Sequence, residues 1–586
     1  MSQASSEHPT ATETGIVDPE LEAERQELRD LAGQPTSKRL GYYFKRSGPG
    51  WLQGAITLGG GSLAGAMYLG VIAGFGMMWL QPLAMILGVI MLSAIAYVTL
   101  STEQRPFMAI NQNVSPVLGW AWLAAAGVAN IVWCMPQFNL ARASIQQNLM
   151  GMEGVPSHLS TVSICVVILA LAIFINYLYI RGASGLRIFE ITLKIMVAMV
   201  VLCFFGVVVA VTINGTLPWG EVFRGLIPDL SMVTRPADAF AAPIAATGAF
   251  ADYWNETITA AQRDRMITAF GTAVGINMTF ILPYSMLRKR WGKEHRGLAI
   301  FDLALGLIIP FVLATSCVVI AAASQFHGQT DDVFDQTGEL NPAMAGPYYS
   351  VVDRRLTEQL GAEAMAELRE EGNEDALAAA RAALPQADRT VAAMLANRDN
   401  MNLAEALEPL TGRAVAQIVF GIGVLGMAVS TIIMLMLISG YVFCEALNRP
   451  GDKVVHMCGT LVAGIGGFMG PFIWGNADAR AALAVPTSVI GGAMIPIAYM
   501  TFLLLMNSRS LLGDRMPTGM RRVRWNVLMV TATSIATIGS VWVLWGQTAT
   551  IFGVPAGRAG IAILATLLVV GLIGFLQKQG RHTRSA

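Results

Sequence analysis

Residues 51–74 read WLQGAITLGGGSLAGAMYLGVIAG, an apolar run interrupted in its middle by Gly59-Gly60-Gly61-Ser62. A helix of this length spans the roughly 30 Å hydrocarbon core of a bilayer. Each glycine lowers helix stability by about 1 kcal/mol. A break inside a membrane is tolerated where protein or a water-filled cavity satisfies the freed backbone groups. The stretch therefore predicts a discontinuous transmembrane helix, the kind of element at which many transporters bind their cargo.

The same residues allow a second interpretation. Ser62, Ala66 and Gly70 recur at four-residue spacing, as do Gly61 and Gly65. Small residues at this spacing let two membrane helices pack closely against each other. The alternative to a broken helix is therefore a continuous one that carries a packing groove.

The rest of the chain has the composition of a membrane protein. Of its 586 residues, 54% are hydrophobic and only 13% are charged, which leaves too few polar groups to cover a soluble globule. About twelve apolar runs approach the length that a membrane span needs. They cover residues 51–74, 79–100, 117–137, 160–180, 188–213, 267–287, 298–323, 415–443, 454–474, 485–506, 527–545 and 559–576. We therefore predict an all-α polytopic membrane protein.

Basic residues predict how the chain is oriented. Short loops rich in Lys and Arg stay on the cytoplasmic side of a membrane. If each run crosses once, all such clusters fall on one side: 38–46, 181–187, 288–296, 515–524 and 578–584. Both termini are then cytoplasmic, in a multi-pass protein of the cell (inner) membrane. The long connections 214–266 and 324–414 are then external.

This orientation divides the chain into five parts. Residues 1–38 are polar and lack the pattern of a signal peptide, so we expect a disordered cytoplasmic tail. Residues 39–323 hold spans one to seven, and 415–576 hold spans eight to twelve. Between them, the Ala-rich and acidic segment 324–414 is expected to form an external helical insert. Residues 577–586 form a second cytoplasmic tail.

Several function classes are disfavoured. The net charge is zero, which does not suit a nucleic-acid partner. The six cysteines lie in or beside apolar runs without a CxxC pair, so neither a disulfide framework nor a zinc site is indicated. We expect no enzyme activity, no catalytic residues and no cofactor. The expected partners are the lipid bilayer and a small cargo.

Four segments resemble, in order, the motifs of one known family. The run Gly48-Pro49-Gly50-Trp51-Leu52 resembles the GPG start of its first span. The run Leu186-Arg187-Ile188-Phe189-Glu190 resembles an RKLE-type segment at span five. Asp302 lies near the predicted inner end of span seven, and Ile495-Pro496-Ile497-Ala498 resembles an LPFA-type segment in span ten. Over roughly 48–545 the chain thus resembles the Nramp family of divalent-metal transporters.

The resemblance implies a fold and a cargo. The family has a LeuT-like inverted repeat of five plus five helices, to which this chain adds about two C-terminal helices. Its cargo is a divalent metal cation. The family's metal-binding DPGN falls on Gly59, Gly60, Gly61 and Ser62, so its carboxylate and amide ligands are missing here.

Two further departures concern spans six and three. The family's MPH motif aligns in two registers, one with its Met at Gly275 and its His at Asn277, the other with its Met on Met278. Span three carries Asn130 and Gln137, amides in place of the family's proton-pathway carboxylates. These departures favour a partly hydrated ion such as magnesium or manganese, moved without proton coupling, as in the Nramp-related magnesium transporters.

The breaks of spans one and six, together with span ten, give a candidate binding site for the substrate or ion, whose metal-ligand set stays unknown. Its residues are Leu58, Gly59, Gly60, Ser62, Asn277, Met278, Thr279 and Ser488. Two other functions stay open: an organic-solute or amino-acid permease of the same fold, and a non-transporting membrane sensor. Nearby, Glu190 and Lys194 are spaced for an ion pair within one helix, and Asp302 is expected to be a structural anchor or gate partner.

Overall fold

A computed structural model describes most of the chain. The described residues are 19–31, 33–152, 157–215, 217–272, 274–335, 337–370, 372–474, 494–546, 550–551 and 554–585. They are almost entirely helical. The short strands β1 (Thr550–Ile551) and β2 (Val554–Pro555) pair antiparallel between the last two long helices.

Nine helical segments among the described residues are long and apolar enough to cross a bilayer. They are α5 (Leu80–Thr102), α7 with the π-helical turn that follows it (Pro116–Leu149), α8 (His158–Ile180), α9 (Ala183–Ile213), α14 to α15 (Lys293–Phe326), α21 with the turn that precedes it (Ala414–Ala446), α22 to α23 (Lys453–Ile473), α27 (Gly519–Trp545) and α28 (Ala556–Ser585). They coincide with predicted spans two to five, seven to nine, eleven and twelve. The prediction of an all-α polytopic membrane protein is confirmed.

The first span is broken. Helix α3 (Pro49–Thr57) and helix α4 (Gly60–Ala73) meet at an angle of 56°. Close packing also occurs further along α4, because a Cβ atom added to Gly70 would lie 2.8 Å from the carbonyl oxygen of Val319 in α15. The glycine-rich run thus breaks the span, and the alternative of a continuous helix is wrong, although Gly70 does allow close packing.

The sixth span differs from its prediction. It consists of α12 (Ala251–Thr272) and α13 (Ile276–Arg288), so its first half begins well before residue 267. The early turns of α12 carry charged side chains such as Asp252 and Glu256, which a search for apolar runs passes over. The connection predicted for 214–266 is therefore partly helical. Of predicted span ten, the structure describes α25 (Ile495–Met506), followed by the short α26 (Arg509–Leu512).

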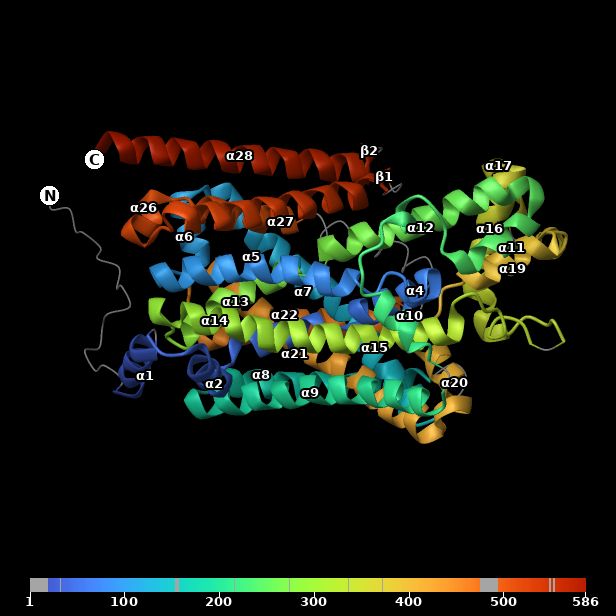
Figure 1. Cartoon of the computed structure of the whole chain (residues 1–586), viewed down its shortest axis with the longest axis horizontal. Helices are drawn as coiled ribbons and strands as arrows, with labels where there is room; N and C mark the ends of the chain where they lie inside the picture. Colours follow the sequence, from blue (N-terminus) through green and yellow to red (C-terminus); the bar gives the residue numbers. More distant parts are fainter. Residues whose placement is uncertain are drawn as a thin grey trace.

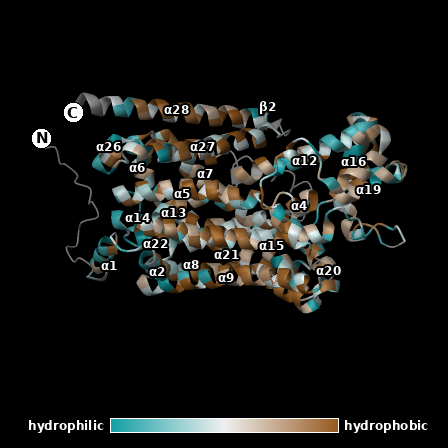
Figure 2. Ribbon diagram, viewed as in Figure 1, coloured by the Kyte–Doolittle hydropathy of each residue, from teal (hydrophilic) through white to brown (hydrophobic). Residues whose placement is uncertain are grey.

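The two ends of the helical bundle differ in composition. Figure 1 shows the insert helices at one end, with the short helices α10 (Trp219–Arg224) and α11 (Ala241–Ala246), opposite α1 and the C-terminal end of α28. The insert comprises α16 (Ala345–Leu360), α17 (Ala362–Leu368), α18 (Glu374–Ala382), α19 (Gln386–Leu395) and α20 (Asn400–Thr411). Hydrophobic residues form the middle of the bundle and hydrophilic residues gather toward both ends (Figure 2).

A buried polar cluster connects the insert to α12, the first half of span six. Arg355 of α16 pairs with Asp388 of α19 at 2.6 Å, and both side chains are fully buried. The indole Nε1 of Trp254 in α12 donates to the same carboxylate at 2.8 Å. A buried ion pair holds its geometry when further hydrogen bonds satisfy it. These contacts connect α12 to the insert.

Part of the tail predicted to be disordered over 1–38 is helical, whereas residues 1–18 lie outside the described part of the chain. Residues 19–31 form α1 (Pro19–Leu31), and α2 (Thr36–Arg46) follows directly. A guanidinium nitrogen of Arg25 donates to the carbonyl oxygen of Arg290 at 3.1 Å, and Arg29 pairs with Glu294 at 3.5 Å. These contacts dock α1 on the loop after α13. Helix α28 likewise continues to Ser585, through most of the predicted C-terminal tail.

Helix α21 forms the centre of the bundle. It packs against α7, α9 and α22, and nearly all of its side chains are buried. Helices α8 and α9 lie at the periphery and leave many apolar side chains exposed, as expected of helices that face lipid. The remaining short helix, α6 (Pro106–Asn113), packs against α7.

Candidate functional site

The break in span one is a single tight turn. Leu58 has φ −78° and ψ 79°, and the N–H of Gly59 donates to the carbonyl oxygen of Thr57 at 3.0 Å, which is an inverse γ-turn centred on Leu58. Gly59 is extended, and α4 starts at the next residue. The turn interrupts the regular hydrogen bonding of the helix, so carbonyl groups at the end of α3 need other partners.

Helix α21 supplies those partners. The hydroxyl of Thr431 lies 2.9 Å from the carbonyl oxygen of Met427 in its own helix. It also lies 3.3 Å from the carbonyl oxygen of Ala55 and 3.2 Å from that of Leu58. The hydroxyl of Ser430 lies 3.2 Å from the same Ala55 oxygen. On span one itself, the hydroxyl of Ser62 donates to Thr57 at 2.5 Å. Hydroxyl groups thus lie beside the backbone carbonyl oxygens of the break. Of the predicted residues, Leu58 contributes such a carbonyl and Ser62 such a hydroxyl.

Helix α7 closes the other side of the break. The side-chain oxygen of Gln137 accepts the N–H of Gly60 at 2.9 Å, at the N-terminus of α4. Gly60 is also tightly enclosed, because a Cβ atom there would lie 2.9 Å from a methyl group of Leu140. Gly61, in contrast, is exposed, and no described atom lies within 4 Å of the position its Cβ would take. The start of α4 therefore has one closed side and one open side.

The break in span six lies just before α13. Gly275 is extended at φ −73° and ψ 158°, and its carbonyl oxygen accepts the N–H of Met278 at 3.0 Å. The side-chain oxygen of Asn277 accepts the same N–H at 2.9 Å. The hydroxyl of Thr279 accepts from the indole of Trp122 at 3.1 Å. The side chain of Asn277 is therefore engaged with the first turn of its own helix, and Thr279 faces α7.

The two breaks meet at one contact. The hydroxyl of Thr57 lies 3.1 Å from the sulfur of Met278. Both side chains are buried. The contact lies at the last residue of α3, beside the predicted run Gly59 to Ser62. Of the other predicted residues, Ser488 lies outside the described part of the chain.

Two buried amides near these elements have no hydrogen-bond partner among the described residues. They are Gln53, on α3 one turn before Thr57, and Asn130, on α7. Both residues are fully buried. An unsatisfied buried amide costs free energy, so such a group indicates a site for water or a ligand. Sequence reasoning placed Asn130 on span three but missed Gln53, although a glutamine in an apolar span was a usable signal.

A second polar cluster lies where α3 begins. Asp302 accepts the N–H of Gly48 at 2.8 Å and that of Gly50 at 2.6 Å. The expected ion pair between Glu190 and Lys194 is wrong, since Glu190 pairs with Lys289 at 2.9 Å. The ammonium group of Lys194 instead donates to the carbonyl oxygen of Ser47 at 2.7 Å. Lys194 and Lys289 both lie near the segment that precedes α3. The i,i+4 spacing rule covers only pairs within one helix, so it does not predict these contacts.

The groups around the two breaks are neutral. They are backbone carbonyls, hydroxyls, amides and one thioether. No group of three His, Cys, Asp or Glu side chains placed to hold a metal ion occurs within the described ranges. Oxygen donors of this kind suit a hard cation that keeps part of its water shell.

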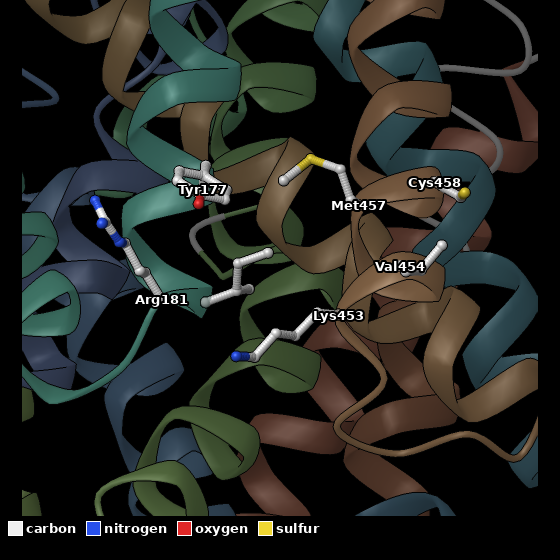
Figure 3. Close-up of a pocket in the computed structure, with 7 residues that line it drawn as sticks. Tyr177, Arg181, Lys453, Val454, Met457 and Cys458 are labelled. Carbon is white, nitrogen blue, oxygen red and sulfur yellow. The ribbon is translucent and has the colours of Figure 1, made fainter.

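A separate hollow of about 340 Å³ lies between α8 and α22 (Figure 3). Figure 3 shows Tyr177 and Arg181 on one side of it and Lys453, Val454 and Met457 on the other. None of its seven lining residues belongs to the predicted site. This hollow is therefore distinct from the two breaks.

The fold and the two breaks define the class of protein: a multi-pass α-helical membrane protein whose first and sixth spans are interrupted and touch each other. The sequence matches the family described as natural resistance-associated macrophage protein-like, Nramp, over residues 50–352 and 377–546. The chain belongs to the Nramp family. A search of curated proteins found no match.

Solved structures agree with this assignment. The manganese transporter of Eremococcus coleocola, in complex with an aromatic bis-isothiourea substituted compound, has a TM-score of 0.62 and 14% sequence identity. The alignment covers 93% of this chain and 97% of the transporter. A mutant of the same transporter aligns over the same shares at the same identity, with a TM-score of 0.53. At this identity the likeness shows the fold, and the predicted LeuT-like class is confirmed.

Proposed function

We propose that this chain transports a divalent metal cation in partly hydrated form, with magnesium or manganese as the favoured ions. The observation that carries the proposal is the contact between Thr57 and Met278, where the two broken spans meet among neutral oxygen donors. Membership of the Nramp family and likeness to a manganese transporter support a divalent cation. The family's carboxylate position is Gly59 in this chain.

The proposed site comprises the residues predicted from the sequence and the buried groups beside them. The predicted set is Leu58, Gly59, Gly60, Ser62, Asn277, Met278, Thr279 and Ser488. We add Gln53, Thr57 and Asn130, because the two amides are buried without a described partner and Thr57 joins the two breaks. Desolvating a bare divalent ion without a paired carboxylate is expensive. A cation that keeps waters avoids most of that cost, and the amides would bind those waters.

Transport is proposed to proceed without proton coupling. A proton pathway through a membrane needs titratable side chains. In α7, Asn130 and Gln137 are amides, and Gln137 is engaged with the N–H of Gly60. Neither group binds or releases a proton at physiological pH. The driving force is then the gradient of the cation and the membrane potential.

We further propose that both termini are cytoplasmic and that the protein is in the cell membrane. The supporting observation is the distribution of Lys and Arg. The end that carries α1 and the C-terminal end of α28 would then be cytoplasmic, and the insert helices would be external (Figure 1). Cysteine labelling of residues 324–414 in intact cells tests this. Labelling only after permeabilisation would contradict it.

Uptake into reconstituted vesicles tests the proposed cargo. Vesicles should accumulate magnesium or manganese, and the uptake should fall when Met278 or Gln53 is replaced by Ala. A matched substitution, Met500→Ala in α25, removes a methionine of the bundle and should leave uptake unchanged. Uptake of amino acids instead of metals would favour the organic-solute permease. Absence of uptake for every solute, from a folded protein, would favour the membrane sensor.

A further inference from the structure

A polar hollow of about 610 Å³ lies at the end of the bundle that carries α1. It is bounded by α2, by the first turns of α9 and by the loop after α13. Its basic lining residues are Lys45, Arg46, Arg187, Lys194 and Lys289, and its acidic ones are Glu24 and Glu190. The lining is therefore net positive.

The two carboxylates are already engaged. Glu190 pairs with Lys289 at 2.9 Å, and Glu24 pairs with Arg46 at 3.3 Å. Lys194 donates to the backbone of Ser47. Within the described ranges, the side chains of Lys45 and Arg187 form neither an ion pair nor a hydrogen bond. Two cations that face one hollow without a counter-charge are suited to bind an anion.

The surroundings of the hollow are apolar and face lipid. Helix α2 exposes Leu40 and Phe44, one turn apart, at 44% and 64%. Helix α9 exposes Ile188, Ile191 and Ile195 at similar fractions, and Ile191 lines the hollow itself. A short helix with basic residues and an exposed apolar edge is typical of the membrane interface. The hollow is therefore open both to headgroups and to acyl chains.

We propose that this hollow binds the phosphate headgroup of an anionic phospholipid. The phosphate lies between Lys45 and Arg187, and the acyl chains run along the isoleucine face of α9. Basic pockets between helices on the cytoplasmic side of a membrane bind such headgroups. A soluble phosphate would not explain why apolar side chains of α2 and α9 are exposed around the hollow.

The location gives the lipid a regulatory effect. Lys45 lies two residues before Ser47, whose carbonyl oxygen is held by Lys194 just ahead of α3. A headgroup that joins Lys45 to Arg187 fixes α2 against α9. The start of the broken span is then held in place, so bound lipid stabilises the observed position of α3.

Lipid binding is measured on the purified full-length protein by native mass spectrometry, with phosphatidylglycerol and with phosphatidylcholine. The test variant is K45Q/R187Q. The control is R521Q/R524Q, which removes two exposed arginines at the start of α27, at the same end of the bundle. Each Lys or Arg that contacts the bound anionic headgroup contributes about fivefold in affinity. The test variant should therefore bind phosphatidylglycerol about 25-fold more weakly, and the control should bind it unchanged.

A second readout is the melting temperature, which phosphatidylglycerol should raise for the wild type and the control but not for the test variant. Equal weakening in both variants would overturn the proposal, since any basic surface would then suffice. An unchanged test variant would also overturn it. Displacement of the lipid by glycerol phosphate at similar affinity would assign the hollow to a soluble anion instead. If the double variant fails to fold, K45Q and R187Q alone should each weaken binding about fivefold.

Discussion

Asp302 accepts the backbone N–H of Gly50 at 2.6 Å, and its other oxygen accepts that of Gly48 at 2.8 Å. The carboxylate thus occupies the N-terminus of α3, where the first N–H groups of a helix have no partner within the helix. Packing is equally close, since a Cβ atom on Gly50 would lie 2.0 Å from the carbonyl oxygen of Asp302. Span seven therefore fixes α3, the first half of the broken span, at its N-terminus.

Asp302→Asn should weaken this clamp. The amide retains one acceptor oxygen, but its NH2 group then faces a backbone N–H. Losing a charged hydrogen bond at a buried site costs about 1.5–3 kcal/mol, which should appear as a lower melting temperature in detergent. Asp514→Asn is the control, because Asp514 is exposed in the turn after α26. Equal melting temperatures for the two variants would show that Asp302 does not hold α3.

Thr431→Val should disturb the break in span one. Valine has nearly the shape of threonine but lacks the hydroxyl that lies near the carbonyl oxygens of Ala55 and Leu58. A buried carbonyl left without a donor costs about 1–3 kcal/mol, so both the melting temperature and cation uptake should fall. Thr501→Val is the matched control. Both buried hydroxyls lie near a carbonyl oxygen of their own helix, and among the described contacts only that of Thr431 also lies near span one. A control variant as impaired as Thr431→Val would contradict a specific role.

The sequence was sufficient to predict the break but not its partners. Three successive glycines in an apolar run weaken a helix locally, so the position of the turn follows from residues that are adjacent in the chain. Thr431 and Gln137 reach the break from α21 and α7. Their roles depend on how distant helices pack, which hydropathy does not encode.

Predictions from the spacing of residues within one segment also failed where contacts between distant segments replace contacts within that segment. Glu190 and Lys194 have the spacing of a helical ion pair, yet Glu190 pairs with Lys289 from the loop after α13. The start of α12 was missed because its first turns carry exposed charges such as Asp252 and Glu256, while a buried residue between them contacts the insert. That residue is Trp254, which is fully buried with its indole on Asp388. The periodic and apolar parts of the fold were predictable, and the polar contacts between distant segments were not.

Gly59→Asp should change the selectivity of transport. It restores a carboxylate at the position that resembles the family's metal ligand, and Gly59 has an extended backbone that any residue adopts. A carboxylate compensates a bare ion, which can then use the sulfur of Met278, and thioether ligands favour manganese over magnesium. Uptake of manganese relative to magnesium should rise about tenfold, a free-energy difference of about 1.4 kcal/mol.

Gly59→Asn is the control for that change. A new Cβ atom at this position lies 2.8 Å from the hydroxyl of Thr431, so either side chain displaces Thr431 slightly. Only Asp adds charge. A selectivity shift that is the same in both variants would be a steric effect and would contradict the role of the carboxylate.

Cation uptake should not move protons. Vesicles that contain a pH-sensitive dye should take up magnesium or manganese without internal acidification, because α7 offers the amides of Asn130 and Gln137 in place of carboxylic acids. Uptake should also be insensitive to an imposed pH gradient when the membrane potential is clamped. Acidification at a fixed ratio to the cation would show that another titratable group carries protons.

Gly60→Leu should abolish uptake while the protein remains folded. A Cβ atom at Gly60 would lie 2.9 Å from a methyl group of Leu140 and 3.3 Å from the side-chain oxygen of Gln137, so a leucine must push into the open side of the break. Gly206→Leu is the control, since Gly206 is in α9 and no described atom lies within 4 Å of the position its Cβ would take. Both variants should elute as single peaks in detergent, and only the first should lose transport. Normal uptake by Gly60→Leu would place the cation path elsewhere than the break of span one.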